Sequence, residues 1–180
     1  MTVRLKYKGI DFMQRFLVGK GNIKELAYEI YRNLDRSREP VFVCVGSDKY
    51  VCDSVAPIVA EYLKNRYNIR ALVYGGLDYN ITADNLSFAI NYITTQHPKS
   101  QVIIIDAALG ELLGEIKVTR DGFPALGRTL PIVSPADFFI LATVGKKSAD
   151  FNLNSTRLRV VVDMAKLVAK SIAMAMSVYA

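Results

Sequence analysis

Blocks of apolar and polar residues alternate along the chain and predict strands and helices in turn. Residues 41–45 are apolar at every position, which is typical of a strand that is covered on both faces. After Gly46 and a polar loop, apolar residues recur at spacings of three and four up to Tyr67, as on the buried face of a helix. A strand, a short loop and a helix form the first half of a βαβ unit, so this stretch predicts a parallel sheet.

The rest of the chain repeats this pattern. Predicted helices cover 23–34, 84–94 and 154–179, and further predicted strands cover 69–74, 101–105, 115–119 and 137–144. We expect an α/β fold, a three-layer αβα sandwich around a mostly parallel central sheet. Within one globular unit, residues 1–39 are expected to form an N-terminal arm and helix, and residues 40–180 the αβα domain. A proline-rich segment at 124–135 is expected to be irregular.

Composition narrows the class of protein. With 180 residues, 51% hydrophobic and 22% charged, the chain can bury a sizeable core. No apolar stretch is long and charge-free enough to span a membrane, and the first residues make a poor secretory signal. Cys44 and Cys52 are too few for a disulfide framework, which favours a reducing cytoplasm. The net charge of +6 allows an acidic partner, but nucleic acid is not expected; a homo-oligomer is compatible with the sequence.

Two aspartates follow two of the predicted strands. Asp53 lies in the loop after 41–45, and Asp106 ends the strongly apolar run QVIIID. Strands joined by helical crossovers are parallel and usually neighbours, so their exit loops lie side by side. In open α/β sheets this edge holds the ligand crevice. We therefore expect Asp53 and Asp106 to lie close together; the alternative is that each is only a helix cap or a turn former.

Such an acidic pair allows two kinds of chemistry. Two neighbouring carboxylates cannot both ionise cheaply, so one keeps a proton and the pair can serve as acid and base on an amide. With carbonyl or water ligands the pair could instead hold a divalent metal. Ser47, Asp48 and Asp78 lie on the same predicted edge and could contact substrate or support the pair, or simply form turns. Cys52 has no evident histidine partner, and His97 reads as a surface loop residue.

Four segments carry a resemblance to a known family. In chain order they are VGSDKYVCDSVAP, VYGGLDYNITADNL, VIIIDAALG and LNSTRLRVVVDMA. They resemble the four blocks of the YyaC family of sporulation proteins, from about Pro40 to the C-terminus. That family is similar to the germination protease of spore-forming bacteria and, more distantly, to the hydrogenase maturation proteases. The resemblance implies a phosphorylase/hydrolase-like fold and the cytoplasm of a spore-forming bacterium.

The germination protease is a peptidase that uses two aspartates, and the resemblance places them at Asp53 in CDSVAP and Asp106 in IIIDAALG. In the hydrogenase maturation proteases the position of Asp53 is an acidic residue that contacts metal. The chain departs from the family pattern at Cys52 and Ala56, where glycines are usual. It also has Asn80-Ile81-Thr82 where the family usually has Pro-Val-His.

The leading functional hypothesis is therefore a peptidase that hydrolyses a protein or peptide substrate with this aspartate pair and no cofactor. One alternative is a non-catalytic sporulation protein that binds a peptide or protein tail in the same cleft. Another is a metal-dependent hydrolase with the same two aspartates as ligands.

Overall fold

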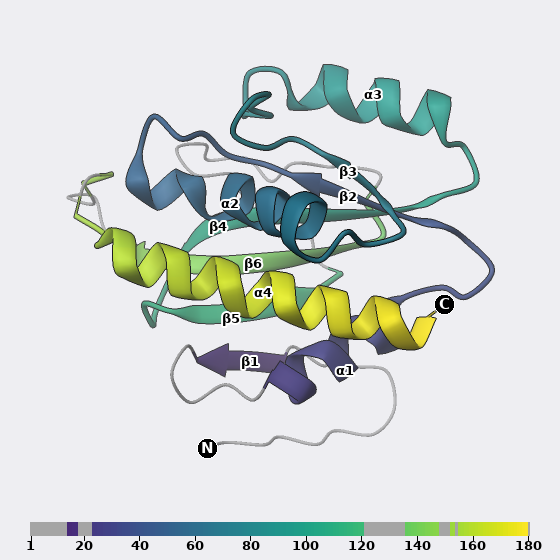
Figure 1. The fold of residues 1–180 in the computed structure, drawn as a ribbon. Coiled ribbons are helices and arrows are strands. Elements are labelled where there is room, and N and C mark those ends of the chain that lie inside the picture. The colour runs from purple at the N-terminus through teal and green to yellow at the C-terminus, as the bar shows by residue number, and fades with distance from the viewer. Residues whose placement is uncertain (1–13, 18–22, 121–135, 148–151, 154, 180) are drawn as a thin grey trace.

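A computed structural model describes residues 14–17, 23–120, 136–147, 152–153 and 155–179 (Figure 1). Its strands are β1 (Gln14–Leu17), β2 (Pro40–Cys44), β3 (Leu72–Tyr74), β4 (Gln101–Gly110), β5 (Glu115–Thr119) and β6 (Phe138–Lys146). Its α-helices are α1 (Ile23–Asn33), α2 (Val55–Glu61), α3 (Leu86–Gln96) and α4 (Leu158–Tyr179). A 3₁₀ turn, Val51–Ser54, precedes α2, and a π-helical turn, Tyr62–Arg66, follows it. Among the described residues, no helix is long and apolar enough to cross a membrane.

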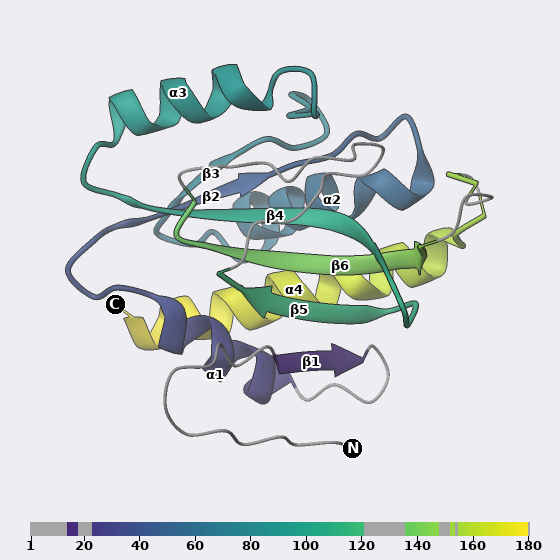
Figure 2. The same ribbon diagram turned by 180° about the vertical axis from the view of Figure 1, so that it is seen from behind.

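The strands form one six-stranded sheet in the order β1-β5-β6-β4-β2-β3. The four strands from β6 to β3 are parallel, and β5 and β1 are added antiparallel at one edge. Helices α1, α2 and α4 cover one face, and α3 covers the other, as Figures 1 and 2 show from opposite sides. The predicted three-layer α/β class and the mostly parallel sheet are confirmed.

The central strands are apolar throughout because both of their faces are buried. In β2, Val41 and Val43 pack towards α3, while Phe42 and Cys44 pack towards α2 and α4. In the neighbouring strand β4, the apolar residues at odd positions pack towards α2 and α4, and those at even positions pack towards α3. This two-sided burial explains why the sequence shows unbroken apolar runs here and not an alternating pattern.

The chain adds β3 on one side of β2 and β4 on the other side, and this reversal positions the site. The chain passes from β2 through α2 to β3 on one side, then returns through α3 to β4 on the other side of β2. The two crossover helices lie on opposite faces of the sheet. The segment that leaves β2 leads to α2 on one face, and the segment that leaves β3 leads to α3 on the other face. These two segments therefore diverge, and a crevice is expected at this edge of the sheet.

The predicted end of the strand 101–105 was wrong. Pairing of β4 with β2 stops at Cys44 and Ile105, but β4 continues beside β6 as far as Gly110. Asp106 thus lies inside a strand, opposite Leu141, and does not end it. The partner strand β6 supplies hydrogen bonds that the local sequence cannot reveal.

Other boundaries also differ from the predictions. Strand β1 was not predicted, and the predicted strand 69–74 is reduced to Leu72–Tyr74. Serine is a common N-cap residue, but the hydroxyl of Ser54, which directly precedes α2, donates to the carbonyl oxygen of Val51 at 2.8 Å and does not cap the helix. The final helix begins at Leu158 and not at 154. Within 1–39, β1 joins the sheet and α1 packs on α4, whereas 124–135 lies outside the described residues.

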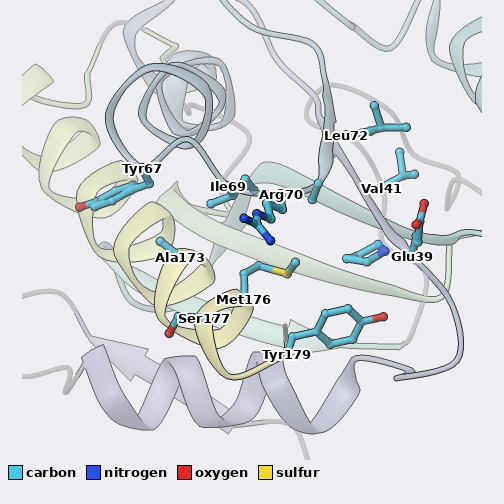
Figure 3. A pocket seen from close by; sticks show the side chains of 12 residues that line it. Glu39, Val41, Tyr67, Ile69, Arg70, Leu72, Ala173, Met176, Ser177 and Tyr179 are labelled. Atoms are coloured by element: carbon cyan, nitrogen blue, oxygen red, sulfur yellow. The ribbon is translucent and has the colours of Figure 1, made fainter.

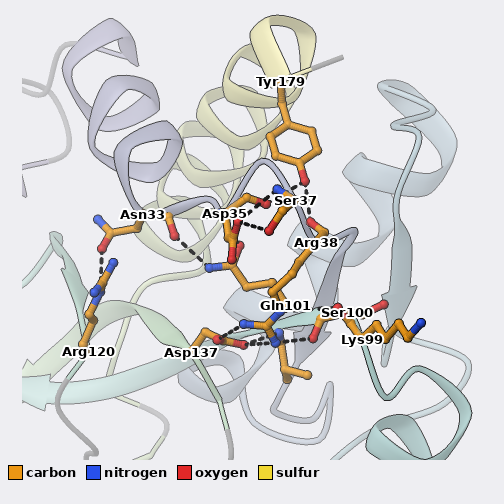
Figure 4. A network of polar contacts seen from close by, with 11 residues as sticks. Asn33, Asp35, Ser37, Arg38, Lys99, Ser100, Gln101, Arg120, Asp137 and Tyr179 are labelled. Atoms are coloured by element: carbon orange, nitrogen blue, oxygen red, sulfur yellow. Dashed lines mark hydrogen bonds and ion pairs between the residues drawn. The ribbon is translucent and has the colours of Figure 1, made fainter.

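The amino ends of β4 and β6 are tied together by a polar network (Figure 4). The Arg38 guanidinium donates to the carboxylate of Asp137 at 2.5 and 3.2 Å and to the carbonyl of Ser100 at 2.5 Å. Asp137 also accepts the N–H of Val102 at 2.8 Å. The carboxylate of Asp137 is thus fully compensated, and the network fixes the link between α1 and β2 to the sheet.

Candidate active site

A cavity of about 300 Å³ lies at the carboxyl ends of β2 and β4. Its lining residues are Val45, Gly46, Ser47, Lys49, Tyr50, Asp53, Thr82, Ala83, Asp84, Asp106 and Leu153. Of the five residues predicted for the site, the fold brings Asp53, Asp106 and Ser47 to this cavity. Asp48 and Asp78 are exposed and do not line it.

The loop that carries Asp53 folds back against the end of β2. Gly46 has a φ of +141°, and a Cβ at this position would lie 2.1 Å from the backbone oxygen of Asp53. Only glycine fits here without a clash. The loop is fixed further by the Gly46 N–H, which donates to Ile81 at 2.7 Å, and the Ser47 N–H, which donates to the backbone oxygen of Asp53 at 3.1 Å.

Asp106 is nearly inaccessible, with 2% of its surface exposed, although it contributes to the cavity wall. One of its carboxyl oxygens, Oδ1, accepts the N–H of Ala107 at 2.6 Å. Burial raises the pKa of Asp106 well above its usual value, and the negative charge of nearby Asp53 raises it further; the Ala107 hydrogen bond opposes both effects. Asp106 therefore retains its proton at pH values where an exposed aspartate has lost it.

Asp53 is in a different environment because it is only half-buried. Burial raises its pKa above the usual value, while a backbone hydrogen bond from Ser47 lowers it. The two carboxyl groups thus differ in solvation and in hydrogen bonding. A single proton held by the pair resides on Asp106 in preference to Asp53, which leaves Asp53 as the carboxylate.

The opposite wall of the cavity comes from the segment between β3 and α3. Ile81 forms an isolated parallel bridge with Val45. The Ser47 hydroxyl donates to Oδ1 of Asn80 at 3.2 Å, and Nδ2 of Asn80 donates to the carbonyl of Gly76 at 2.8 Å. Oδ1 of Asn85 accepts the N–H of Thr82 at 2.8 Å. These bonds link the loop that bears Asp53 to the wall.

Sequence reasoning did not place this wall in the site. Thr82, Ala83 and Asp84 line the cavity, and Thr82 stands where the resemblance would put a histidine. That departure from the family pattern was the one feature of the sequence that pointed to this wall. Leu153 also lines the cavity, although it lies 47 residues from Asp106 along the chain, and no local pattern in the sequence marks it.

The other reactive side chains do not suit catalysis. Cys52 is buried, and burial together with the nearby Asp53 charge raises the pKa of its thiol to about 11. Burial raises the pKa of Cys44 to about 12. Neither cysteine therefore provides a thiolate near neutral pH. His97 lies at the C-terminal end of α3, where its Nε2 is 2.7 Å from the Tyr74 hydroxyl, and it does not line the cavity.

The donor set for a metal is incomplete. Within the part of the chain that the structure describes, no group of three His, Cys, Asp or Glu side chains is close enough together to hold an ion. Asp53 and Asp106 would supply only part of a coordination shell, and backbone carbonyls or water would have to supply the rest.

A larger cavity, about 720 Å³, lies at the opposite, amino end of β2 and β3 (Figure 3). Its walls are mostly apolar and include Ile69, Leu72 and Met176, with Glu39 and Arg70 as charged members. It has no pair of acids, so its size alone does not make it the better candidate for hydrolysis.

Comparison with known proteins places the chain in a family. Residues 16–171 match the family described as "Protein of unknown function (DUF1256)". The chain belongs to the DUF1256 family. It is also 33% identical over 140 residues to the "Uncharacterized protein YyaC" of Bacillus subtilis (strain 168), an alignment that covers 74% of this chain and 68% of that protein. The resemblance to YyaC is thus confirmed.

The fold of this DUF1256 protein is similar to that of a solved protease structure. It is a [NiFe] hydrogenase maturation protease, HycI, from Thermococcus kodakarensis KOD1. The TM-score is 0.54 at 17% sequence identity, and the match covers 77% of this chain and 92% of the protease. The similarity extends to the fold, which is the phosphorylase/hydrolase-like architecture that the resemblance implied.

Proposed function

We propose that this DUF1256 protein is a peptidase in which Asp53 and Asp106 share one proton and hydrolyse a peptide bond. The observation that carries the proposal is that both aspartates line one cavity, while Asp106 is buried beside the charge of Asp53. Placing one acid beside another in a partly buried cavity costs free energy, and pairs of this kind are concentrated at functional sites.

The two acids take different roles in the proposed reaction. Asp53, as the carboxylate, accepts a proton from water, and the water oxygen attacks the scissile carbonyl carbon. Asp106 gives its proton to the carbonyl oxygen, which forms a tetrahedral intermediate. The C–N bond then breaks, the proton on Asp53 passes to the leaving amine, and Asp106 recovers its proton from the collapsing hydroxyl.

The comparisons support the proposal at the level of the fold. HycI is by name a maturation protease, and this chain shares its fold. The resemblance to sporulation proteins suggests a protein substrate made during spore formation, in the cytoplasm of the forespore or mother cell. Small basic spore-type proteins are accordingly the first substrates to test.

The test compares aspartates inside and outside the cavity. Asp53→Asn and Asp106→Asn should each lower the rate of peptide cleavage by about a thousandfold, a typical loss for an essential acid or base. Asp48→Asn and Asp78→Asn, which alter exposed aspartates outside the cavity, should change the rate by less than about threefold. Thermal unfolding of each variant shows whether the fold is retained.

Three outcomes would contradict this mechanism. Cleavage that survives both cavity substitutions would exclude the two acids as the catalytic pair. Activity that a chelator removes and a divalent metal restores would favour a metal-dependent hydrolase with the same ligands. Tight binding of the substrate without turnover, lost in Asp53→Asn, would favour a peptide-binding protein.

The division of roles also predicts a pH profile. Activity requires Asp53 ionised and Asp106 protonated. Since both pKa values are raised and that of Asp106 is raised more strongly, the rate should rise as Asp53 ionises and fall as Asp106 loses its proton. A bell-shaped dependence of kcat/KM on pH is expected, and a rate that is flat from acid to alkaline pH would contradict the roles.

A further inference from the structure

The position of Asp53 in the cavity depends on the loop that follows β2, and Ser47 connects that loop to its surroundings. The Ser47 N–H donates to the backbone oxygen of Asp53 at 3.1 Å. The Ser47 hydroxyl accepts the N–H of Lys49 at 3.1 Å and donates to Oδ1 of Asn80 at 3.2 Å. The single proton of this hydroxyl is thus used on a residue that lies 33 positions further along the chain.

Asn80 is itself held by hydrogen bonds on two sides. Its Nδ2 donates to the carbonyl of Gly76 at 2.8 Å, and its backbone oxygen accepts a hydrogen bond from Nδ2 of Asn85 at 3.1 Å. Because an amide nitrogen only donates and an amide oxygen only accepts, the bond to Gly76 turns Oδ1 of Asn80 towards Ser47. The orientation of the Asn80 side chain is therefore set by its own segment and not by Ser47 alone.

The segment that bears Asn80 is anchored to the end of β2. Gly75 has a φ of +84°, and a Cβ at this position would lie 2.2 Å from the backbone oxygen of Cys44, the last residue of β2. Such a close approach of two backbones requires glycine. The Gly46 N–H, which donates to Ile81 at 2.7 Å, fixes the same segment on its other side of Asn80. Asn80 therefore connects a well-anchored part of the fold to the loop that carries the catalytic candidate.

Asn80 does not itself line the cavity, whereas Ser47 and Asp53 do. A substrate bound in this cavity therefore meets Ser47 and Asp53 and not the Asn80 side chain. Any effect of Asn80 on the reaction must pass through Ser47. Displacement of a reacting group by about 1 Å can lower a rate by about a hundredfold, so such an indirect effect can be large.

We propose that Asn80 is a positioning residue, which acts through Ser47 to hold Asp53 in the place and orientation that hydrolysis beside Asp106 requires. This inference rests on the proposed function, because it assigns Asn80 a role in the same reaction. The contact between Asn80 and Ser47 can nevertheless be measured without any substrate, so the two proposals can fail separately.

Hydrogen exchange at the Ser47 amide measures the contact. Asn80→Ala removes the acceptor of the Ser47 hydroxyl, so the Ser47 N–H should exchange about tenfold faster, the effect of one or two hydrogen bonds. Asn65→Ala is the matched control, because Nδ2 of Asn65 donates to Glu61 at 2.8 Å and neither residue lines the cavity. It should leave the exchange of Ser47 unchanged. Unchanged exchange at Ser47 in folded Asn80→Ala would overturn the proposal.

The isosteric variant Asn80→Asp keeps the proposal testable if Asn80→Ala does not fold. It retains an oxygen for the Ser47 hydroxyl but loses the donor to the carbonyl of Gly76. Exchange at Ser47 should then be about three to ten times faster than in the wild type, because the side chain is no longer held in its orientation. A rate equal to that of the wild type would again overturn the proposal.

Peptide cleavage separates a positioning role from substrate binding. Asn80→Ala should lower kcat by about ten- to a hundredfold and change KM by less than about threefold, because Asn80 does not line the cavity. Ser47→Ala removes the same hydrogen bond from its other end, so the double variant should be no slower than the slower single variant.

Three kinetic outcomes would overturn the role of Asn80. A raised KM with an unchanged kcat would make Asn80 a substrate contact, and multiplying effects in the double variant would show that it does not act through Ser47. A wild-type chain that cleaves no peptide would remove the proposed function and with it the catalytic role of Asn80. Faster exchange at Ser47 in Asn80→Ala would then still establish the contact, which distinguishes the two failures.

Discussion

Asp137 and Asp106 lie near opposite ends of the neighbouring strands β6 and β4, and their surroundings differ in one decisive way. Asp137, at the amino end, meets the Arg38 guanidinium at 2.5 Å and the Val102 N–H at 2.8 Å. Asp106, towards the carboxyl end, accepts the N–H of Ala107 at 2.6 Å and lies near the negative charge of Asp53. One aspartate is compensated by a cation, and the other is placed beside a second acid.

The difference separates a structural aspartate from a candidate catalytic one. Burying a carboxylate costs several kcal/mol unless a cation and hydrogen bonds compensate the charge. Asp137 satisfies this condition, and its ion pair with Arg38 joins the link between α1 and β2 to the sheet. Asp106 has no cation partner within the described residues and avoids the cost by keeping its proton. A protonated acid next to a carboxylate is a reactive arrangement, whereas an ion pair is not.

The largest effect on stability is expected at the acidic end, from Gly46→Ala. The new Cβ would lie 2.1 Å from the backbone oxygen of Asp53 at a φ of +141°. Strain and overlap together should lower the free energy of unfolding by about 3 kcal/mol and displace Asp53, so peptidase activity should be lost as well.

Urea denaturation measures the effect of Gly46→Ala, with Gly110→Ala as its control. A Cβ at Gly110 would meet only the side chain of Thr143, at 3.0 Å. Gly110→Ala should therefore cost less than about 1.5 kcal/mol. Equal losses in the two variants would show that the close approach at Gly46 is not what shapes the Asp53 loop.

A smaller effect is expected at the compensated end, from Arg38→Ala. Removing the guanidinium leaves Asp137 with the Val102 N–H as its remaining hydrogen bond in the network. Because the two side chains are 35% and 25% exposed, solvent screens the loss, and unfolding should become easier by about 2 kcal/mol.

Peptidase activity should survive Arg38→Ala at temperatures where the variant is folded, because the ion pair is remote from the cavity. Arg32→Ala is the control, since Arg32 is 45% exposed and pairs with Glu29 on the same helix. It should cost less than about 1 kcal/mol in thermal or urea unfolding. A loss of activity in folded Arg38→Ala would remove the distinction between the two ends.

A pH dependence of stability is also expected, at Asp106. Its folded-state pKa is raised, so the native state binds more protons than the unfolded state once pH exceeds the ordinary aspartate value. Stability should therefore decline as pH rises towards the folded pKa. Asp106→Asn should remove this decline. The melting temperature of the variant minus that of the wild type should therefore increase from acidic to alkaline pH. A constant difference across pH would contradict the raised pKa.

Sequence patterns predicted the parallel core because its strands are buried on both faces and its helices carry continuous apolar stripes. They also placed Asp53 and Asp106 on one edge, since exit loops of parallel neighbours lie together; the structure brings both to one cavity, and their catalytic role stays a prediction. The sequence could not show that β4 passes Asp106, because β6 supplies that pairing. Strand β1 was missed because four residues, QRFL, form a strand only through their pairing with β5.

The walls of the cavity were equally hidden from sequence reasoning. Thr82 and Leu153 reach the cavity through tertiary packing of segments that carry no motif for chemistry. Asp48 and Asp78 share the sequence features that singled out Asp53, but the turns around them direct them to solvent. Burial, which distinguishes these aspartates, depends on the whole fold and not on the neighbouring residues.

The central claim, that Asp53 and Asp106 form one titrating pair, is tested most directly by carbon-13 NMR of the aspartate carboxyl groups as a function of pH. Asp106 should titrate well above pH 3.8, and its pKa should fall in Asp53→Asn, because the neighbouring negative charge is then absent. A pKa of Asp106 near 3.8, or a raised value that Asp53→Asn leaves unchanged, would contradict the claim.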